Sequence, residues 1–186
     1  MKNKLFNPFL YIAGGQALGL GLLAMAATAV IGYLNNSHFN GVLDFHKPEE
    51  LLHASIYVSF AEQGIILLSS VLIFYIAGLI FSKSSIRLID VAGTLTLARW
   101  PMIVAALLGF CMHASVAKKA DVTHLGLVAS LGVVLCVIWM VALMYNAFTV
   151  SCNLKSGKGI AVFVVSLFIA ALASNLFCKL AYNFMV

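Results

Sequence analysis

Three ionisable side chains lie within or beside long uncharged tracts of the chain and could act together. They are Glu62, His113 and Lys179. A carboxylate and an ammonium that meet inside a membrane can neutralise each other, and a histidine beside them can exchange a proton near neutral pH. With Asn175, one helical turn before Lys179, they could form a polar vestibule for an ion, a proton or a lipid headgroup. The alternative is that each side chain snorkels to the nearest membrane surface.

A second set of polar residues is expected toward the opposite membrane surface. Asn146 shares a helical face with Ala142 and Asn153, and Gln16 has a similar depth near the start of the chain. Arg99 stands directly before Trp100-Pro101, where a guanidinium can reach lipid phosphate. We expect these side chains to form hydrogen bonds between helices. The alternative is an inner polar site, made of Asn146, Gln16 and Arg99, that takes part in transport.

Histidines and acids gather in the segment from 38 to 53. Imidazole and carboxylate groups are zinc ligands, so this segment is either a surface metal site or a solvated loop. No pair has the tight spacing of a metal motif, and we expect neither a metal nor another cofactor. The residues concerned are His38, His46, His53, Asp44, Glu49 and Glu50.

Sequence signatures do not favour an enzyme. The run from Gly19 to Ala24 matches a dinucleotide fingerprint, but that motif needs a strand before it and here it lies in a long apolar stretch. The motifs of zinc proteases, phosphate-binding loops and serine hydrolases do not occur. Asn35-Asn36-Ser37 is a glycosylation sequon by pattern, and Cys111 and Cys178 are expected at similar depth, where a disulfide is conceivable.

The composition decides the class of protein. Of 186 residues, 63% are hydrophobic and only 9% are charged, whereas soluble domains have about 25% charged residues. The mean hydropathy is +1.06. So little polar surface excludes soluble enzymes, disordered chains and coiled coils, and predicts an integral membrane protein. The net charge of +5 needs no nucleic-acid partner, because basic loops beside anionic lipid explain it.

Uncharged tracts give the number of membrane crossings. A spanning helix needs about 20 such residues, and five tracts qualify, at 5–43, 63–82, 100–117, 122–154 and 159–178. We therefore predict an all-α integral membrane protein, a single five-span bundle over residues 1–186 with short loops. The predicted spans are 8–33, 58–81, 100–117, 125–149 and 159–182. Interfacial helices are expected near 48–57 and 85–98, although 48–81 could instead form one long helix.

Small residues follow one face of the first predicted span. They recur at spacings of three and four residues, which is the repeat of one helical face. In lipid, such a face lets helix backbones approach closely, so we expect this span to be central; a narrow path is the alternative. The residues are Gly14, Ala17, Gly21, Ala24 and Thr28.

The distribution of basic residues predicts orientation. With the N-terminus in the cytoplasm, the inner segments carry seven Lys and Arg residues and the outer ones four, which follows the positive-inside rule. The first span is too long for the apolar part of a signal peptide. We expect the N-terminus in the cytoplasm and the C-terminus outside, in a bacterial inner membrane.

Several of these features resemble the Yip domain family. They are the five spans, Asn7-Pro8-Phe9 at the start, Gly93-Thr94 before Ala98-Arg99-Trp100-Pro101, and Tyr145-Asn146-Ala147-Phe148 before the turn that contains Lys155 and Lys158. The resemblance covers nearly the whole chain and implies no catalytic residues. Eukaryotic members bind prenylated Rab GTPases and carry a long cytosolic N-terminal segment. Only seven residues precede Pro8 here, so the resemblance implies a compact bacterial member without small-GTPase binding.

Two functions are compatible with these patterns. The first is a non-enzymatic membrane protein of Yip type that organises lipids or partner proteins, with a protein partner or a homo-oligomer as further options. The second is a small permeation or transport protein for an ion or lipid, which uses the vestibule around Glu62. Transport would require a continuous polar path from Glu62 to Asn146.

Overall fold

The computed structural model describes residues 7–47, 55–116, 124–154 and 157–185, without the side chains of 113–116 and 185. Within these ranges the chain forms one short 3-10 helix, η1 (Pro8–Leu10), and a set of α-helices. The α-helices are α1 (Gly14–Asn35), α2 (Ile56–Phe81), α3 (Leu88–Ala98), α4 (Pro101–Val116), α5 (His124–Ser151) and α6 (Gly157–Met185). A single bridge between His38 and His46 is the extent of β pairing in this part of the chain.

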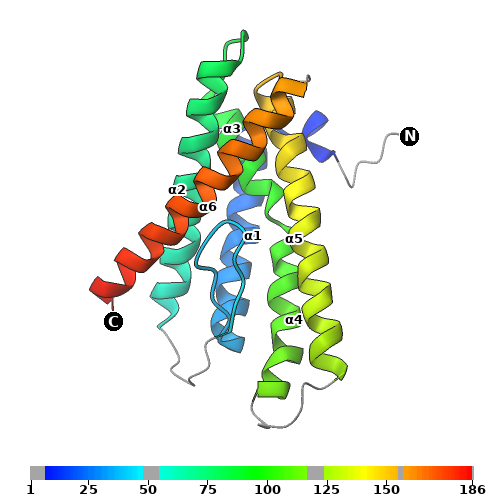
Figure 1. Ribbon diagram of the computed structural model, residues 1–186, viewed down its shortest axis with the longest axis vertical. Helices are drawn as coiled ribbons and strands as arrows, with labels where there is room; N and C mark the ends of the chain where they lie inside the picture. Colours follow the sequence, from blue (N-terminus) through cyan, green and yellow to red (C-terminus); the bar gives the residue numbers. More distant parts are fainter. Residues whose placement is uncertain (1–6, 48–54, 117–123, 155–156, 186) are drawn as a thin grey trace.

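Five apolar helices are long enough to cross a membrane. Four of them are α1, α2, α5 and α6, and the fifth, Leu88–Met112, combines α3 with most of α4. Their alternating directions place the described start and the described end of the chain at opposite ends of the bundle (Figure 1). The all-α, five-helix prediction is confirmed, and the protein is an integral membrane protein.

The third span differs from its prediction. It begins at Leu88 rather than at residue 100, and the helix expected to lie in the interface near 85–98 is instead packed inside the bundle, with Val91, Leu95 and Ala98 buried. Pro101 explains the break between α3 and α4, because proline has no N–H and its ring clashes with the preceding helical turn. The break falls in the middle of the span, where α3 and α4 meet end to end (Figure 1). Of the other expected interfacial helix, at 48–57, residues 48–54 lie outside the described part, and Ile56 and Tyr57 form the start of α2.

The small face of α1 packs against α3. A Cβ placed on Gly21 would lie 2.6 Å from the backbone nitrogen of Leu97, and one placed on Gly93 would lie 2.3 Å from the carbonyl oxygen of Gly14. Ala17 and Thr28 are buried on the same face, and Ala24 is half-buried. The two backbones are therefore nearly in contact, which only small residues permit.

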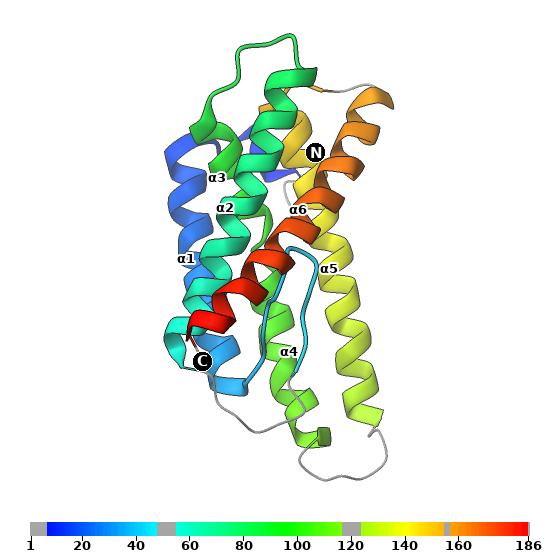
Figure 2. The ribbon, with the colours of Figure 1, turned by 60° about the vertical axis from the view of Figure 1, so that its left-hand side comes forward.

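The segment 36–47 turns back into the bundle. Asn36 ends α1 in the left-handed conformation (φ 55°), and the N–H of Ser37 then donates to the carbonyl of Gly32 at 2.8 Å, as in common helix C-caps. The segment then rises to the middle of the molecule and returns, in front of α4 and α5 and beside α6 (Figure 2). Phe39 and Val42 are buried at 1% and 0% exposure. We call residues 36–47 the re-entrant segment.

Aromatic side chains pack in the interior between α2, α5 and α6. Phe74 of α2 packs at a centroid distance of 5.4 Å from Phe148 of α5 and 5.6 Å from Phe163 of α6. Trp100, directly before α4, and Trp139 of α5 meet edge to face at a centroid distance of 4.5 Å. These contacts fill the space between the helices with apolar groups.

We predict that Gly21→Leu destabilises the protein. The new side chain would have to displace the backbone of α3, and overpacking of this kind costs about 1–3 kcal/mol. The measurement is the melting temperature in detergent. Gly19→Leu is the matched control, because a Cβ at Gly19 meets nothing within 4 Å. Equal melting temperatures for the two variants would contradict close packing of α1 on α3.

Orientation is testable at two exposed positions. Ser84 follows α2, and Asn183 lies near the end of α6 at the opposite end of the bundle. In a chain whose four cysteines are replaced by alanine, we expect Asn183→Cys to react with an impermeant maleimide in spheroplasts. Ser84→Cys should react only after permeabilisation. The reverse pattern would invert the orientation predicted from the basic residues.

Candidate functional site

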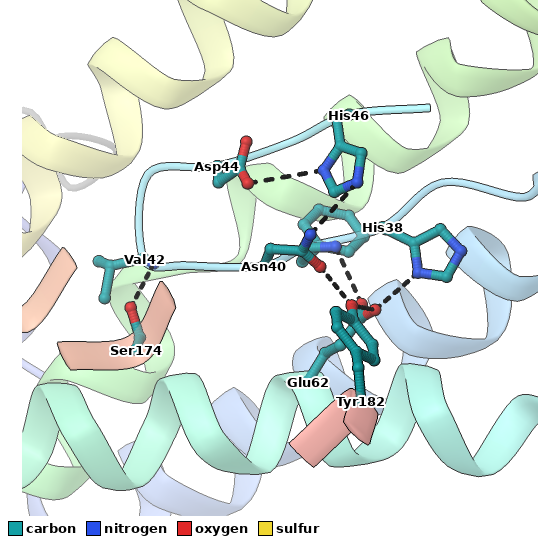
Figure 3. Close-up of polar contacts among 9 residues, drawn as sticks. His38, Asn40, Val42, Asp44, His46, Glu62, Ser174 and Tyr182 are labelled. Carbon is teal, nitrogen blue, oxygen red and sulfur yellow. Dashed lines mark hydrogen bonds and ion pairs between the residues drawn. The ribbon is translucent and has the colours of Figure 1, made fainter. Parts of the chain in front are cut away.

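Glu62 is the centre of a buried polar cluster. It lies in α2 and is 1% exposed, yet its carboxylate accepts hydrogen bonds from three sources (Figure 3). The Nδ1 of His38 donates at 2.6 Å and the backbone N–H of Phe39 at 2.9 Å. The hydroxyl of Tyr182, from α6, donates to the same carboxylate. Such charge-assisted bonds are about twice as strong as neutral ones, so Glu62 fixes the base of the re-entrant segment to α2 and α6.

The cluster extends into the re-entrant segment. The hydroxyl of Tyr182 also contacts the side-chain oxygen of Asn40, and the Asn40 amide lies 3.3 Å from Nε2 of His46. Nδ1 of His46 faces Asp44 at 3.5 Å, and this hydrogen bond raises the pKa of His46, with burial acting in the opposite direction. We call this set the loop cluster, which consists of His38, Asn40, Asp44, His46, Glu62 and Tyr182.

Backbone pairing gives the re-entrant segment its narrow shape. His38 and His46 exchange backbone hydrogen bonds of 2.9 and 3.1 Å, and their rings stack at a centroid distance of 5.9 Å. Lys47 donates to the carbonyl of Asn35 at 2.5 Å, and burial lowers the pKa of Lys47 to about 8. The two arms of the segment are thus tied together close to its base.

The tip of the re-entrant segment reaches Arg99. Nη1 of Arg99 donates to the carbonyl oxygen of Val42 at 3.1 Å. The N–H of Val42 donates to the hydroxyl of Ser174 in α6 at 3.1 Å, a bond that Figure 3 shows. Arg99 is 3% exposed, and its Nε and Nη2 have no hydrogen-bond partner among the residues that the structure describes. The re-entrant segment is therefore held at both ends by buried ionisable residues: the acidic Glu62 binds its lower end, and the basic Arg99 binds its tip.

The predicted vestibule is only partly assembled. Glu62 is buried in the loop cluster, but Lys179 is exposed and Asn175 is half-buried, and neither bonds to Glu62. The inward face of α6 carries Ala170, Ser174 and Cys178. Lys179 follows Cys178 directly, so helical rotation of about 100° turns it outward. The side chain of His113 lies outside the described part of the chain.

The predicted inner polar site is not gathered in one place. Gln16 is exposed on α1 and Asn146 is half-buried on α5, whereas Arg99 is buried at the break between α3 and α4. Arg99 was expected at the membrane surface because it borders an uncharged tract. The position of α3 inside the bundle moves it to the middle of a span instead.

The other sequence candidates are also accounted for. His38 and His46 belong to the loop cluster, and His53, Glu49 and Glu50 lie outside the described residues. Within the described ranges, no group of three His, Cys, Asp or Glu residues is placed to hold a metal ion. All four cysteines are free thiols. Asn35 of the sequon is buried, and its amide donates to the carbonyl of Ala106 at 2.5 Å, which leaves that nitrogen unavailable to a glycan.

Sequence reasoning missed most of the partners of Glu62. Tyr182 and Asn40 were not singled out, and His38 was assigned to a metal site or a solvated loop. The available signal was the apolar spacing of Phe39, Val42 and Phe45 within an otherwise polar segment. A fully solvated loop has no need for such residues.

We predict energetic coupling between Glu62 and Tyr182. Glu62→Gln removes the charge that strengthens the bond, so Tyr182→Phe should lower the melting temperature less in that background than in the native protein. Interactions of this kind couple by about 0.5–3 kcal/mol. A cycle of Glu62→Gln with Lys179→Met serves as the control, because the exposed Lys179 should give additive shifts. Additivity in both cycles would mean that the buried carboxylate and Tyr182 do not act together.

Comparisons with known protein families, with curated proteins and with solved structures find no match for this chain. Membership of the Yip family stays a prediction from the sequence. The function must therefore be argued from the geometry of the protein itself.

Proposed function

We propose that this chain is a non-enzymatic membrane protein of Yip type, which organises lipids in a bacterial inner membrane and takes a lipid acyl chain between α2 and α6. The supporting observation is a groove of about 500 Å³ between these helices. Its lining is almost wholly apolar and includes Ile73, Ala77, Ile80, Val162, Val165 and Ile169. Ser166 is its one polar lining residue among those described.

The shape of the groove comes from small residues beneath large ones. Ala77 and Ser166 are buried, whereas Ile80, Val165 and Ile169 are more than half or half exposed along the rim. The groove therefore opens sideways from the bundle, at the depth of the membrane hydrocarbon. An acyl chain is the occupant that this chemistry favours, because apolar walls at that depth offer dispersion contacts and no hydrogen bonds.

The packing of the interior favours lipid organisation over transport. Ile66, Phe74, Leu143 and Met144 are fully buried between Glu62 and the level of Asn146. The intervening Ser69 and Ser70 of α2 donate to carbonyls of their own helix and so make no polar link between helices. The re-entrant segment fills the remaining interior with Phe39 and Val42.

The second candidate function is permeation of an ion or lipid. It is favoured by one observation, the buried Arg99 in a broken helix near the middle of a span, because broken helices form the binding sites of many transporters. The alternating access that transport requires would have to move the re-entrant segment. A protein partner or a second copy of the chain would instead compete with lipid for the groove.

Binding of an acyl chain in the groove can be tested by filling the groove with a larger side chain. We expect a phospholipid with a photoactivatable acyl chain to label peptides of α2 and α6, and Ala77→Phe to reduce this labelling several-fold. Ala142→Phe on α5 is the matched control, because Ala142 is exposed and lies outside the groove. Labelled residues are identified by mass spectrometry. Labelling that Ala77→Phe leaves unchanged would contradict an acyl chain at this site.

A further inference from the structure

We propose that Arg99 is the receptor of an anion site in the middle of the membrane, covered by the re-entrant segment, for a ligand with a carboxylate or phosphate group. This site is separate from the acyl-chain groove, and the proposal does not rest on lipid binding there. Arg99 lies near the centre of the apolar element Leu88–Met112. Ionisable residues at such depth are rare and usually functional.

The free edge of the guanidinium has the geometry of an oxyanion receptor. Nη1 donates to Val42, whereas Nε and Nη2 are buried and have no partner in the described part of the chain. Nε and Nη2 form one side of the planar guanidinium, and their two parallel N–H groups match the two oxygens of a carboxylate or phosphate. The edge left open is thus the edge that binds an oxyanion side-on.

The charge of Arg99 has no counterion among the described residues. Glu62 accepts from His38, Phe39 and Tyr182, and Asp44 faces His46. Asp90 pairs with Arg87 at the start of α3. Within the described ranges, a neutral carbonyl is therefore the sole hydrogen-bond partner of a buried cation. An unpaired charge in a low-dielectric interior is the costly state, and an anionic ligand would relieve it.

The re-entrant segment is suited to act as the cover. Its tip is held by the hydrogen bonds of Val42 to Arg99 and Ser174, while the stronger bonds to Glu62 lie at its base. Withdrawal of the tip would release Nη1 of Arg99 from Val42, so that the whole guanidinium becomes available to an anion.

The anion could come from the aqueous phase or from a lipid headgroup, and the experiment separates these sources. The full chain is purified in non-ionic detergent, and its melting temperature is followed during titration with phosphate or acetate at constant ionic strength in chloride. A parallel series uses nanodiscs of phosphatidylcholine with and without phosphatidic acid. We expect a saturable rise in melting temperature with a soluble anion, with the anionic lipid, or with both, and the responding arm identifies the source.

Variants connect the response to Arg99. We expect Arg99→Met to abolish the shift and Arg99→Lys to weaken it, because an ammonium is a point charge without the side-on edge. Lys179→Met removes an exposed cation instead and should keep the full response. A shift that persists in Arg99→Met would indicate general ionic stabilisation and overturn the proposal.

A second measurement keeps Arg99 intact, so it does not depend on the folding of the arginine variants. In the cysteine-free chain, Val42→Cys places a thiol at the buried tip of the re-entrant segment. Anion binding that displaces the tip should raise its rate of maleimide labelling several-fold. Unchanged melting temperature and unchanged labelling with phosphate, acetate and phosphatidic acid would overturn the proposal.

Discussion

The re-entrant segment is held between two buried charges of opposite sign, and the arrangement of the bundle depends on this. Glu62 binds the base of the segment through His38 and the backbone of Phe39, and Arg99 binds its tip through the carbonyl of Val42. A polypeptide that enters a membrane without helical bonding must have its polar groups satisfied by protein. Glu62, Arg99, Ser174 and Tyr182 provide part of these hydrogen bonds, and they come from α2, from the junction between α3 and α4, and from α6. The segment therefore joins helices that are far apart in the sequence.

The break between α3 and α4 sets the position from which Arg99 binds the re-entrant segment. Without it, Arg99 would continue a regular helix, and its side-chain direction would be set by helical rotation alone. Pro101 ends the regular bonding of α3, and the turn at Arg99 and Trp100 is closed by short-range backbone bonds to Thr96 and Leu97. The close packing of α1 on α3 through Gly21 and Gly93 then fixes the level of α3 in the bundle. The tip of the re-entrant segment meets the guanidinium because the break at Pro101 and the packing of α1 on α3 together set the position of Arg99.

The five-span architecture could be predicted from the sequence because it depends on summed hydropathy, to which no single residue is essential. The start of the third span could not. Arg99 borders an uncharged tract and so appeared to precede the third span. The span in fact starts near Arg87 and Asp90, which remain close to a surface. A rule that counts charges assumes that no charge is buried, and it fails at the one arginine that is 3% exposed. The position of Glu62 near an uncharged tract could predict that it lies within the membrane, but it could not predict the partners of Glu62. They come from a segment whose histidines and asparagines are equally compatible with a solvated loop, and from Tyr182, whose orientation depends on the crossing of α6 over α2.

The two buried charges differ in how completely they are satisfied, and this difference bears on function. Glu62 has three hydrogen-bond partners, so the base of the re-entrant segment is a structural anchor. Arg99 has a single neutral acceptor among the described residues. The low-dielectric interior that strengthens this hydrogen bond also raises the free-energy cost of leaving the other edge of the guanidinium unpaired. Structural arginines in protein interiors normally have several acceptors, because their five N–H groups must all be placed. Two unpaired nitrogens at the centre of a span lower the free energy of unfolding. Proteins keep such destabilising features mainly at sites of function. The anchor at Glu62 and the unsatisfied edge at Arg99 therefore have separate roles, one in holding the re-entrant segment and the other in binding beneath it.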